Sequence, residues 1–308
     1  MAQRRPGPAP RYLLRNGTGA VLPDGDPLAG EAYLVVVESD GRSPEARVYL
    51  AAPLALEDLE SSLGDQAVTE HVVSWDEQHG RRARVERRLG AIVLNDRPDD
   101  APDPARVAEA VAEAIRRRGL QVLPWSDRAT RLRQRLAFLH AHDPRWPDVS
   151  DQALSATLLA AMGDVLGRVR SADALRRIDL VEPLLALLDW RQRAELEGVA
   201  PVHFEAPTGS RLPIDYSDPA APAVFVRLQE MFGVRETPSL LDGRVPLTLH
   251  LLSPAQRPVQ VTRDLAGFWR SSYFDVRKDL RARYPKHPWP DDPLSAPPTA
   301  RATPRRRG

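Results

Sequence analysis

The spacing of the apolar residues changes near residue 98, and this change restricts the possible folds of the chain most. Between residues 11 and 97, apolar and polar residues alternate at period two, as they do in half-buried β-strands. The exception is residues 56–64, where leucines recur at helical spacing and a glycine ends the run. We expect about five strands, with this short helix between the third and the fourth. That order suits a five-stranded Greek-key barrel of the OB type, and any other small β-barrel is the alternative.

Residues 98–200 have the apolar periodicity of amphipathic helices and predict a helical domain. Asp103 is placed to begin a helix that Gly119 ends. Ser126 and Ser150 are placed as N-caps of the next two helices, because a serine hydroxyl accepts a hydrogen bond from a free backbone N–H of the first turn.

The rest of the chain predicts a third domain and two tails. Residues 201–294 combine extended runs with a final helical run, so we expect a C-terminal α+β domain. Residues 1–10 are expected to be a flexible N-terminus, and residues 295–308 a disordered basic tail with nothing to bury. The predicted fold class is therefore multidomain α+β: an OB-like five-stranded β-barrel over residues 11–97, a central helical region and a C-terminal α+β domain.

The composition excludes several kinds of site. The 308 residues include no cysteine, which rules out disulfides and thiolate zinc sites. No apolar run approaches the roughly 20 residues that cross a bilayer. The first residues lack the apolar stretch of a secretory signal. We therefore expect a cytoplasmic protein with no membrane partner.

Motifs for nucleotide chemistry are missing from the sequence. A phosphate-binding loop of the form G-x-x-x-x-G-K-[ST] needs a lysine after a glycine, and neither Lys278 nor Lys286 follows one. No G-x-G-x-x-G follows an expected strand, and no G-x-S-x-G occurs. We expect no cofactor and no catalytic site in this chain.

The segment HAHD is the best metal-like cluster, and it consists of His140, His142 and Asp143. It falls at the end of an expected helix, where two positions along the helix place the histidine rings about 200° apart. We therefore interpret the HAHD segment as the end of a helix, and a metal-dependent hydrolase site is the alternative.

The first candidate site for nucleic acid is a run of arginines in one expected strand, and its members are Arg81, Arg82, Arg84, Arg87 and Arg88. Period-two alternation places Arg82, Arg84 and Arg88 on one face, together with Glu86, which suits contact with phosphates. The alternative is a solvated strand whose arginines pair with acids. The net charge of −7 over residues 11–100 favours that alternative.

The second candidate site is the segment RARYPKHPWP, with Arg281, Arg283, Tyr284, Lys286 and Trp289. Basic and aromatic residues in alternation suit single-stranded nucleic acid, because bases stack on aromatic rings while cations hold the phosphates. The alternative is that the prolines and Trp289 lock this segment against the fold.

The run from Gly243 to Thr299, GRVPLTLHLLSPAQRPVQVTRDLAGFWRSSYFDVRKDLRARYPKHPWPDDPLSAPPT, closely resembles the C-terminal end of the bacterial ATP-dependent RNA helicases of the HrpB family, in the DEAH/RHA class. The segments GSRLPIDYSD and VRLQEMFGVRETP resemble the part just before it. RYLLRNGTGAVLPDGDPLAG and RRLGAIVLNDRP are similar to the OB-fold region of that family. The resemblance covers residues 3–300.

This resemblance implies a role without catalysis in this chain. The family has two RecA-like lobes with the ATP-binding loop, the DEAH-type box and the arginine finger, and none of these motifs occurs here. The chain therefore resembles a C-terminal accessory portion of such a helicase. The implied partners are single-stranded RNA or DNA and the RecA-like lobes, while ATP and Mg are implied only for the lobes.

Two other functions stay open on the sequence alone. One is a structural or protein-interaction module that does not bind nucleic acid. The other is the metal-dependent hydrolase with its site in the HAHD segment.

Overall fold

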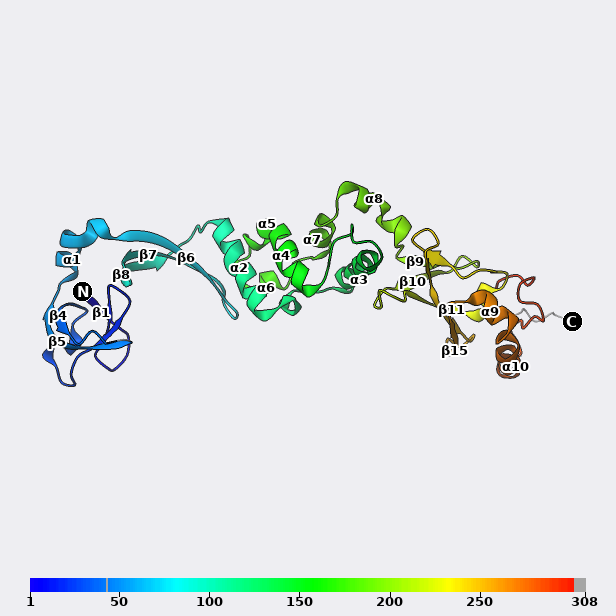
Figure 1. Ribbon diagram of the computed structural model, residues 1–308, viewed down its shortest axis with the longest axis horizontal. Coiled ribbons are helices and arrows are strands. Elements are labelled where there is room, and N and C mark those ends of the chain that lie inside the picture. The colour runs from blue at the N-terminus through cyan, green and yellow to red at the C-terminus, as the bar shows by residue number, and fades with distance from the viewer. Residues whose placement is uncertain (43, 302–308) are drawn as a thin grey trace. The chain divides into compact units, whose positions relative to one another are not determined.

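The structure is a computed structural model that describes residues 1–42 and 44–301. The chain divides into two compact units, each described here by itself. The first contains Met1–Ala114 and Gly163–Leu175, and the second contains Ile115–Met162 and Arg176–Gly308. In Figure 1 the N-terminal strands are blue, the central helices green, and the C-terminal strands and helices yellow to brown.

The first unit begins with a closed five-stranded barrel. Its strands are β1 (Ala2–Arg4), β2 (Arg11–Leu14), β3 (Gly19–Val21), β4 (Tyr33–Ser39) and β5 (Glu45–Pro53). They follow the order β1-β2-β3-β5-β4, and β1 also pairs with β4 to close the barrel. Between β3 and β4 lies the short helix η1 (Pro27–Gly30). The barrel core consists of Ala2, Tyr12, Ala20, Leu22, Leu34 and Val48.

The barrel confirms the predicted fold class, but its fifth strand is β1 from the N-terminus and not a strand from residues 68–98. We predicted a flexible N-terminus over residues 1–10, and this is wrong for Ala2–Arg4. That strand pairs with β2 on one side and β4 on the other, and Ala2 is only 1% exposed. Because β1 completes the ring of five strands, the barrel has no free edge for a strand from residues 68–98.

Residues 68–98 form a separate three-stranded sheet in the same unit. The helices α1 (Leu56–Leu63) and η2 (Gly64–Gln66) precede it, and its strands are β6 (Val68–Asp76), β7 (Gly80–Leu89) and β8 (Ile92–Pro98). All its pairs are antiparallel and β7 is the central strand. Leu89, Ile92 and Leu94 pack with Leu59 of α1 in a second core cluster. The arginine run therefore lies outside the barrel, which corrects its predicted place.

The central region is helical, as predicted. Its helices are α2 (Pro104–Arg118), η3 (Leu120–Val122), α3 (Asp127–His142), α4 (Asp151–Ala161), α5 (Gly163–Leu166), α6 (Ala172–Leu175), α7 (Val181–Ala186) and α8 (Trp190–Val199). The two serine N-caps are confirmed: Ser126 accepts from the Ala129 N–H at 3.2 Å, and Ser150 accepts from the Ala153 N–H at 3.3 Å. These bonds satisfy backbone donors that a helix cannot satisfy itself.

The C-terminal region of the second unit combines a sheet with two helices. The five-stranded sheet has the order β15-β14-β11-β10-β9. Its strands are β9 (His203–Glu205), β10 (Arg211–Asp215), β11 (Ala223–Arg227), β14 (Thr248–Leu252) and β15 (Pro258–Thr262). The remaining elements are η4 (Leu228–Met231), β12 (Ser239–Leu240), β13 (Val245–Pro246), α9 (Leu265–Arg270) and α10 (Tyr273–Arg283).

The end of the chain differs from the prediction in two respects. The expected single helix after residue 262 is two helices, α9 and α10, separated at Ser271 and Ser272. Residues 295–301, predicted to be disordered, contact the second unit: the Thr299 N–H donates to the Gln229 carbonyl at 3.0 Å. The remaining residues of the predicted tail, 302–308, lie outside the described residues. Within the described part of the chain, no helix is long and apolar enough to span a membrane.

Candidate nucleic-acid interface

Strand β7 carries the arginine run, and its burial follows the predicted period of two. Val85 is 7% exposed and Leu89 is fully buried, so this side of the strand faces the core. Arg82 and Arg84 are exposed on the opposite side. The strand therefore presents cationic side chains on an accessible face of the three-stranded sheet.

Each of the arginines on this face already pairs with an acid of the same sheet. Arg82 lies 3.0 Å from Asp76, and Arg84 pairs with Asp96. Arg88 lies 2.7 Å from Glu86. The pairs of Arg82 and Arg84 reach solvent, and ion pairs that water screens in this way contribute little to the stability of a protein. A phosphate can replace such a carboxylate partner at little cost in folding free energy.

The other two arginines of the run differ from these three. Arg87 points to the opposite side, where its guanidinium lies 3.0 Å from Glu60 and donates to the Gly64 carbonyl at 3.0 Å. It joins α1 to the sheet and so has a structural role. The backbone N–H of Arg81 donates to the Arg170 carbonyl at 3.1 Å, and its side chain is half-buried. The structure thus separates the five predicted residues into three outward cations and two at packing contacts.

Of the three acids that pair with these arginines, the sequence pattern placed only Glu86 on this face and did not identify Asp76 or Asp96. The only signal for them was the excess of acidic residues over this segment, which favoured a solvated, paired strand. Their partnership depends on register: Glu86 shares β7 with Arg88, while Asp76 and Asp96 come from the two neighbouring strands. Sequence spacing alone does not give that register.

Asp76 organises the turn between β6 and β7. Its carboxylate accepts the backbone N–H of His79 at 2.8 Å and that of Gln78 at 3.0 Å, and it lies 2.9 Å from Nδ1 of His79. The backbone N–H of His79, then its side chain and the N–H of Gln78, lower the pKa of Asp76 from 3.8 to about 2. Hydrogen bonds to the charged carboxylate favour that form.

We expect this turn to lose its order as the pH falls from about 4 to about 2. A lowered pKa means that the stabilising contribution is complete above the ordinary value of 3.8 and is lost as Asp76 takes up a proton. In an NMR titration, the amide signals of Gln78 and His79 should shift with a midpoint near 2. The same titration of Asp76→Asn should show no such transition, and a wild-type midpoint near 3.8 would contradict the assignment.

The residues of the second predicted site, RARYPKHPWP, differ in their exposure to solvent. Arg281, Arg283 and Lys286 are exposed, and Tyr284 is half-buried. Trp289, however, is only 8% exposed, and its indole N–H donates to the Tyr284 carbonyl at 2.9 Å. A buried indole offers no free face for a base, so the prediction that Trp289 binds nucleic acid does not fit this geometry.

The contacts of the segment support the alternative that it locks the chain end against the fold. Arg277 of α10 donates to the Trp289 carbonyl at 3.0 Å, and the Tyr273 hydroxyl donates to the Pro290 carbonyl at 2.8 Å. Burial raises the pKa of Tyr273 to about 12, so this hydroxyl stays a donor across the physiological range. The Gly233 N–H donates to the Pro293 carbonyl at 2.9 Å.

The three residues of the HAHD segment do not converge. Nδ1 of His140 lies 2.7 Å from the Trp146 carbonyl, and Nε2 of His142 lies 3.2 Å from the Pro219 carbonyl. Asp143 binds Arg145 at 2.6 Å, and this contact holds the pKa of Asp143 at about 2. Among the described residues, no group of three or more His, Asp or Glu side chains is placed to hold a metal ion.

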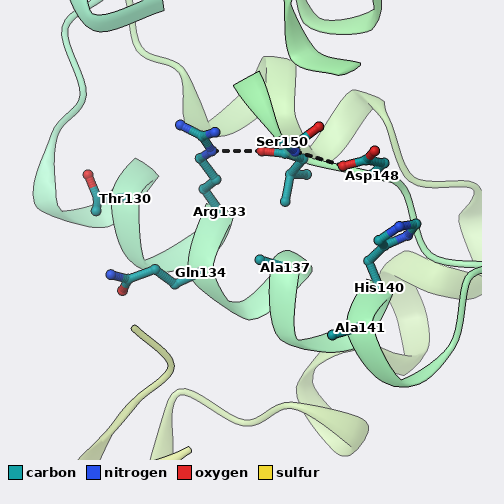
Figure 2. Close-up of a pocket in the computed structure, with 9 residues that line it drawn as sticks. Thr130, Arg133, Gln134, Ala137, His140, Ala141, Asp148 and Ser150 are labelled. Carbon is teal, nitrogen blue, oxygen red and sulfur yellow. Dashed lines mark hydrogen bonds between the residues drawn. The ribbon is translucent and has the colours of Figure 1, made fainter. Parts of the chain in front are cut away.

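His140 lines a cavity of about 470 Å³ that Figure 2 shows. Its neighbours there include Arg133, Asp148 and Ser150, a set of residue types that also occurs in catalytic sites. In this cavity Arg133 donates to the Val149 carbonyl at 2.9 Å, and Asp148 accepts the Ser150 N–H at 2.8 Å. The first bond holds the loop before α4 against α3 and the second orders that loop, so both have structural roles.

Comparisons with known proteins agree with the regions described above. A family model for the C-terminal region of ATP-dependent helicases matches residues 162–293. A model for the connector region of the ATP-dependent RNA helicase HrpB matches residues 66–99, which include the whole three-stranded sheet. The ATP-dependent RNA helicase HrpB of Escherichia coli K12 is 38% identical over 305 residues. That alignment covers 97% of this chain and 38% of the relative.

Two solved structures are also similar over nearly the whole chain. The crystal structure of the E. coli DExH-box NTPase HrpB has a TM-score of 0.61 and 38% identity, covering 98% of this chain and 38% of that one. A crystal structure of the E. coli DEAH/RHA helicase HrpB has a TM-score of 0.56 and 34% identity, covering 94% and 36%. The chain thus spans less than two fifths of these relatives. In sequence and fold the chain therefore corresponds to the C-terminal region of the HrpB helicases, including their connector.

Proposed function

We propose that this chain is an accessory, strand-handling part of an ATP-dependent RNA helicase, which contacts single-stranded nucleic acid and docks on the ATPase lobes. The observation that carries the proposal is the 38% identity to the E. coli RNA helicase across 97% of the chain. Binding of nucleic acid and docking are properties that we extend to this chain from that likeness and from its surfaces.

Two features of the first unit support contact with a single strand. The barrel has five strands in the order β1-β2-β3-β5-β4 with a short helix between β3 and β4, so we assign it to the OB type, a common binder of oligonucleotides. The outward arginines of β7 form a cationic row, and phosphates can compete with their carboxylate partners, of which Asp96 is exposed and Asp76 and Glu86 are half-buried. Neither feature requires an aromatic side chain on which a base of the nucleic acid would stack.

The barrel also has an apolar outer surface that suits docking. Val37 of β4 is 66% exposed, and Tyr49 and Leu50 of β5 are 60% and 53% exposed. A contiguous patch of exposed apolar side chains marks a surface that a protein partner covers, and we propose that these three residues contribute to such a patch. We assign it to the ATPase lobes, because this chain spans only 38% of the helicase that it resembles.

Nucleotide hydrolysis is assigned to the lobes, and not to this chain. The sequence has no phosphate-binding loop, since neither lysine follows a glycine. We therefore propose that ATP and Mg bind outside these 308 residues. The purified chain is expected to hydrolyse no ATP with or without RNA, and turnover above that of a mock purification would contradict the assignment.

A salt titration tests the nucleic-acid part of the proposal. Fluorescence anisotropy with a labelled oligouridine is expected to show binding whose logarithmic affinity falls linearly with the logarithm of the salt concentration. The slope should be about −0.7 per phosphate contact, which gives roughly −2 for the three outward arginines of β7. A slope near zero, or no binding at low salt, would leave the protein-interaction module as the better function.

A further inference from the structure

A second cavity, of about 540 Å³, lies between α3, α7 and α8 in the second unit. Its lining combines a charged wall from α3 with an aliphatic wall from α7, α8 and the residue before β9. The lining residues are Asp127, Arg128, Arg131, Leu132, Arg135, Val181, Leu185, Leu196 and Val202. Arg128, Arg131 and Arg135 recur at helical spacing in the sequence, whereas nothing in the spacing indicates the apolar wall opposite them.

The three arginines form one stripe along α3. Positions 128, 131 and 135 are separated by three and four residues, so their side chains are neighbours on the helix surface. Like charges at these spacings repel each other and destabilise the helix. Asp127 is the single acid among the nine lining residues, so the lining itself does not balance the stripe.

The arginines divide into one structural group and two available ones. Arg135 is 7% exposed and donates to the Ala200 carbonyl at 2.7 Å, and it also lies 2.8 Å from Glu197. It therefore caps the C-terminal end of α8. Arg128 and Arg131 are exposed, and no acid of the described residues forms an ion pair with either guanidinium.

The opposite wall offers apolar surface that is only partly covered. Leu185 and Val202 are half-buried, whereas Leu132 and Leu196 are 6% exposed at the base of the cavity. A volume of 540 Å³ falls within the range of roughly 300–1,000 Å³ found for small-molecule sites. A mostly apolar lining with a few charged groups at one side is the usual composition of such sites.

We propose that this cavity binds a small organic anion with an apolar body, such as a carboxylate joined to an aliphatic chain. The anionic group pairs with Arg128 and Arg131, and the apolar body covers Leu185 and Val202. No aromatic side chain lines the cavity, so it has no platform for a nucleobase. The inference rests on the lining of this cavity and does not depend on the proposed function.

Fluorescence of 8-anilinonaphthalene-1-sulfonate, an aromatic anion, tests this inference in the full chain. The wild type is expected to bind the dye at one saturable site, and decanoate is expected to displace it. Arg128→Gln with Arg131→Gln should weaken binding roughly a hundredfold or more, since each of the two charged hydrogen bonds lost weakens it by at least about tenfold. Both arginines are exposed, so the double variant is expected to keep its fold.

Two further variants make the test specific. Leu185→Gln should weaken decanoate more than the short anion acetate, because it removes apolar surface and leaves the charges. Arg270→Gln, which removes an exposed arginine of α9, should leave both affinities unchanged. Equal affinity of the double-arginine variant and the wild type would overturn the proposal. Displacement of the dye by oligouridine but not by decanoate would also overturn it, in favour of a phosphate site for nucleic acid.

Discussion

Replacing Trp289 by alanine is expected to destabilise the second unit by about 3–5 kcal/mol, the usual cost of removing a buried large aromatic side chain. Trp289 is 8% exposed, so the substitution leaves a cavity in place of the indole. It also removes the donor to the Tyr284 carbonyl, which lies 2.9 Å from the indole nitrogen. This hydrogen bond closes the turn at the end of α10.

Hydrogen exchange followed by mass spectrometry is the suitable measurement, because the chain has two units and a single unfolding transition is not expected. Peptides from α9, α10 and residues 284–294 should exchange faster in Trp289→Ala, while those of the barrel should not change. Trp289→Phe should show a smaller effect, since it keeps a ring. Lys286→Ala, an exposed change in the same segment, is the control. Equal protection in Trp289→Ala and this control would contradict the structural role.

The structure of residues 281–290 explains why their basic and aromatic composition wrongly suggested that Trp289 binds nucleic acid. Arg281, Arg283 and Lys286 are exposed, as a binding site requires, but the tryptophan among them is buried. The sequence reports which residue types occur together, whereas burial depends on where the chain turns after α10. The prolines limit that turn, and the contacts of Arg277 and Tyr273 with the carbonyls of Trp289 and Pro290 fix it. These contacts are not visible in the spacing.

Local signals predicted the helices well and the strand partners poorly. Ser126 and Ser150 marked helix starts correctly, because an N-cap hydrogen bond reaches only three residues along the chain. Strand pairing is not local in this sense. The three-residue strand β1 has no apolar alternation, yet it closes the barrel by pairing with residues 12–14 and 33–34. β1 can be recognised as a strand only when the positions of the other four barrel strands are known.

The arginine run was predicted in the barrel and not in the separate sheet for the same reason, because strand pairing is not local in the sequence. Alternation correctly gave the buried side of β7, with Val85 and Leu89, and the outward side with Arg82 and Arg84. It did not give the sheet to which the strand belongs. The match of a connector model to residues 66–99 agrees with a separate element between the barrel and the helices. A cationic face on that element is the feature whose function most needs a direct test.

Reversing the charge of Arg82 and Arg84 together is expected to weaken oligouridine binding by roughly tenfold to hundredfold, given the usual effect of one or two charged contacts. The loss of affinity has two causes. Two contacts with phosphates disappear, and glutamates at these positions repel the phosphates of the nucleic acid. The salt slope should become smaller in magnitude by about 1.4, which corresponds to two contacts on single-stranded nucleic acid. Fluorescence anisotropy across a salt series measures both quantities.

The controls separate a local site from net charge and from misfolding. Arg263→Glu with Arg270→Glu makes the same change in net charge at exposed positions of the second unit, and it should weaken binding much less. Arg82→Gln with Arg84→Gln avoids placing glutamates beside Asp76 and Asp96, which now pair with these arginines. If the glutamine pair lowers the affinity and the slope while circular dichroism is unchanged, the outward face of β7 contacts the strand. If both glutamate pairs weaken binding equally, β7 is a solvated connector and the contact lies elsewhere, with the barrel as the next surface to test.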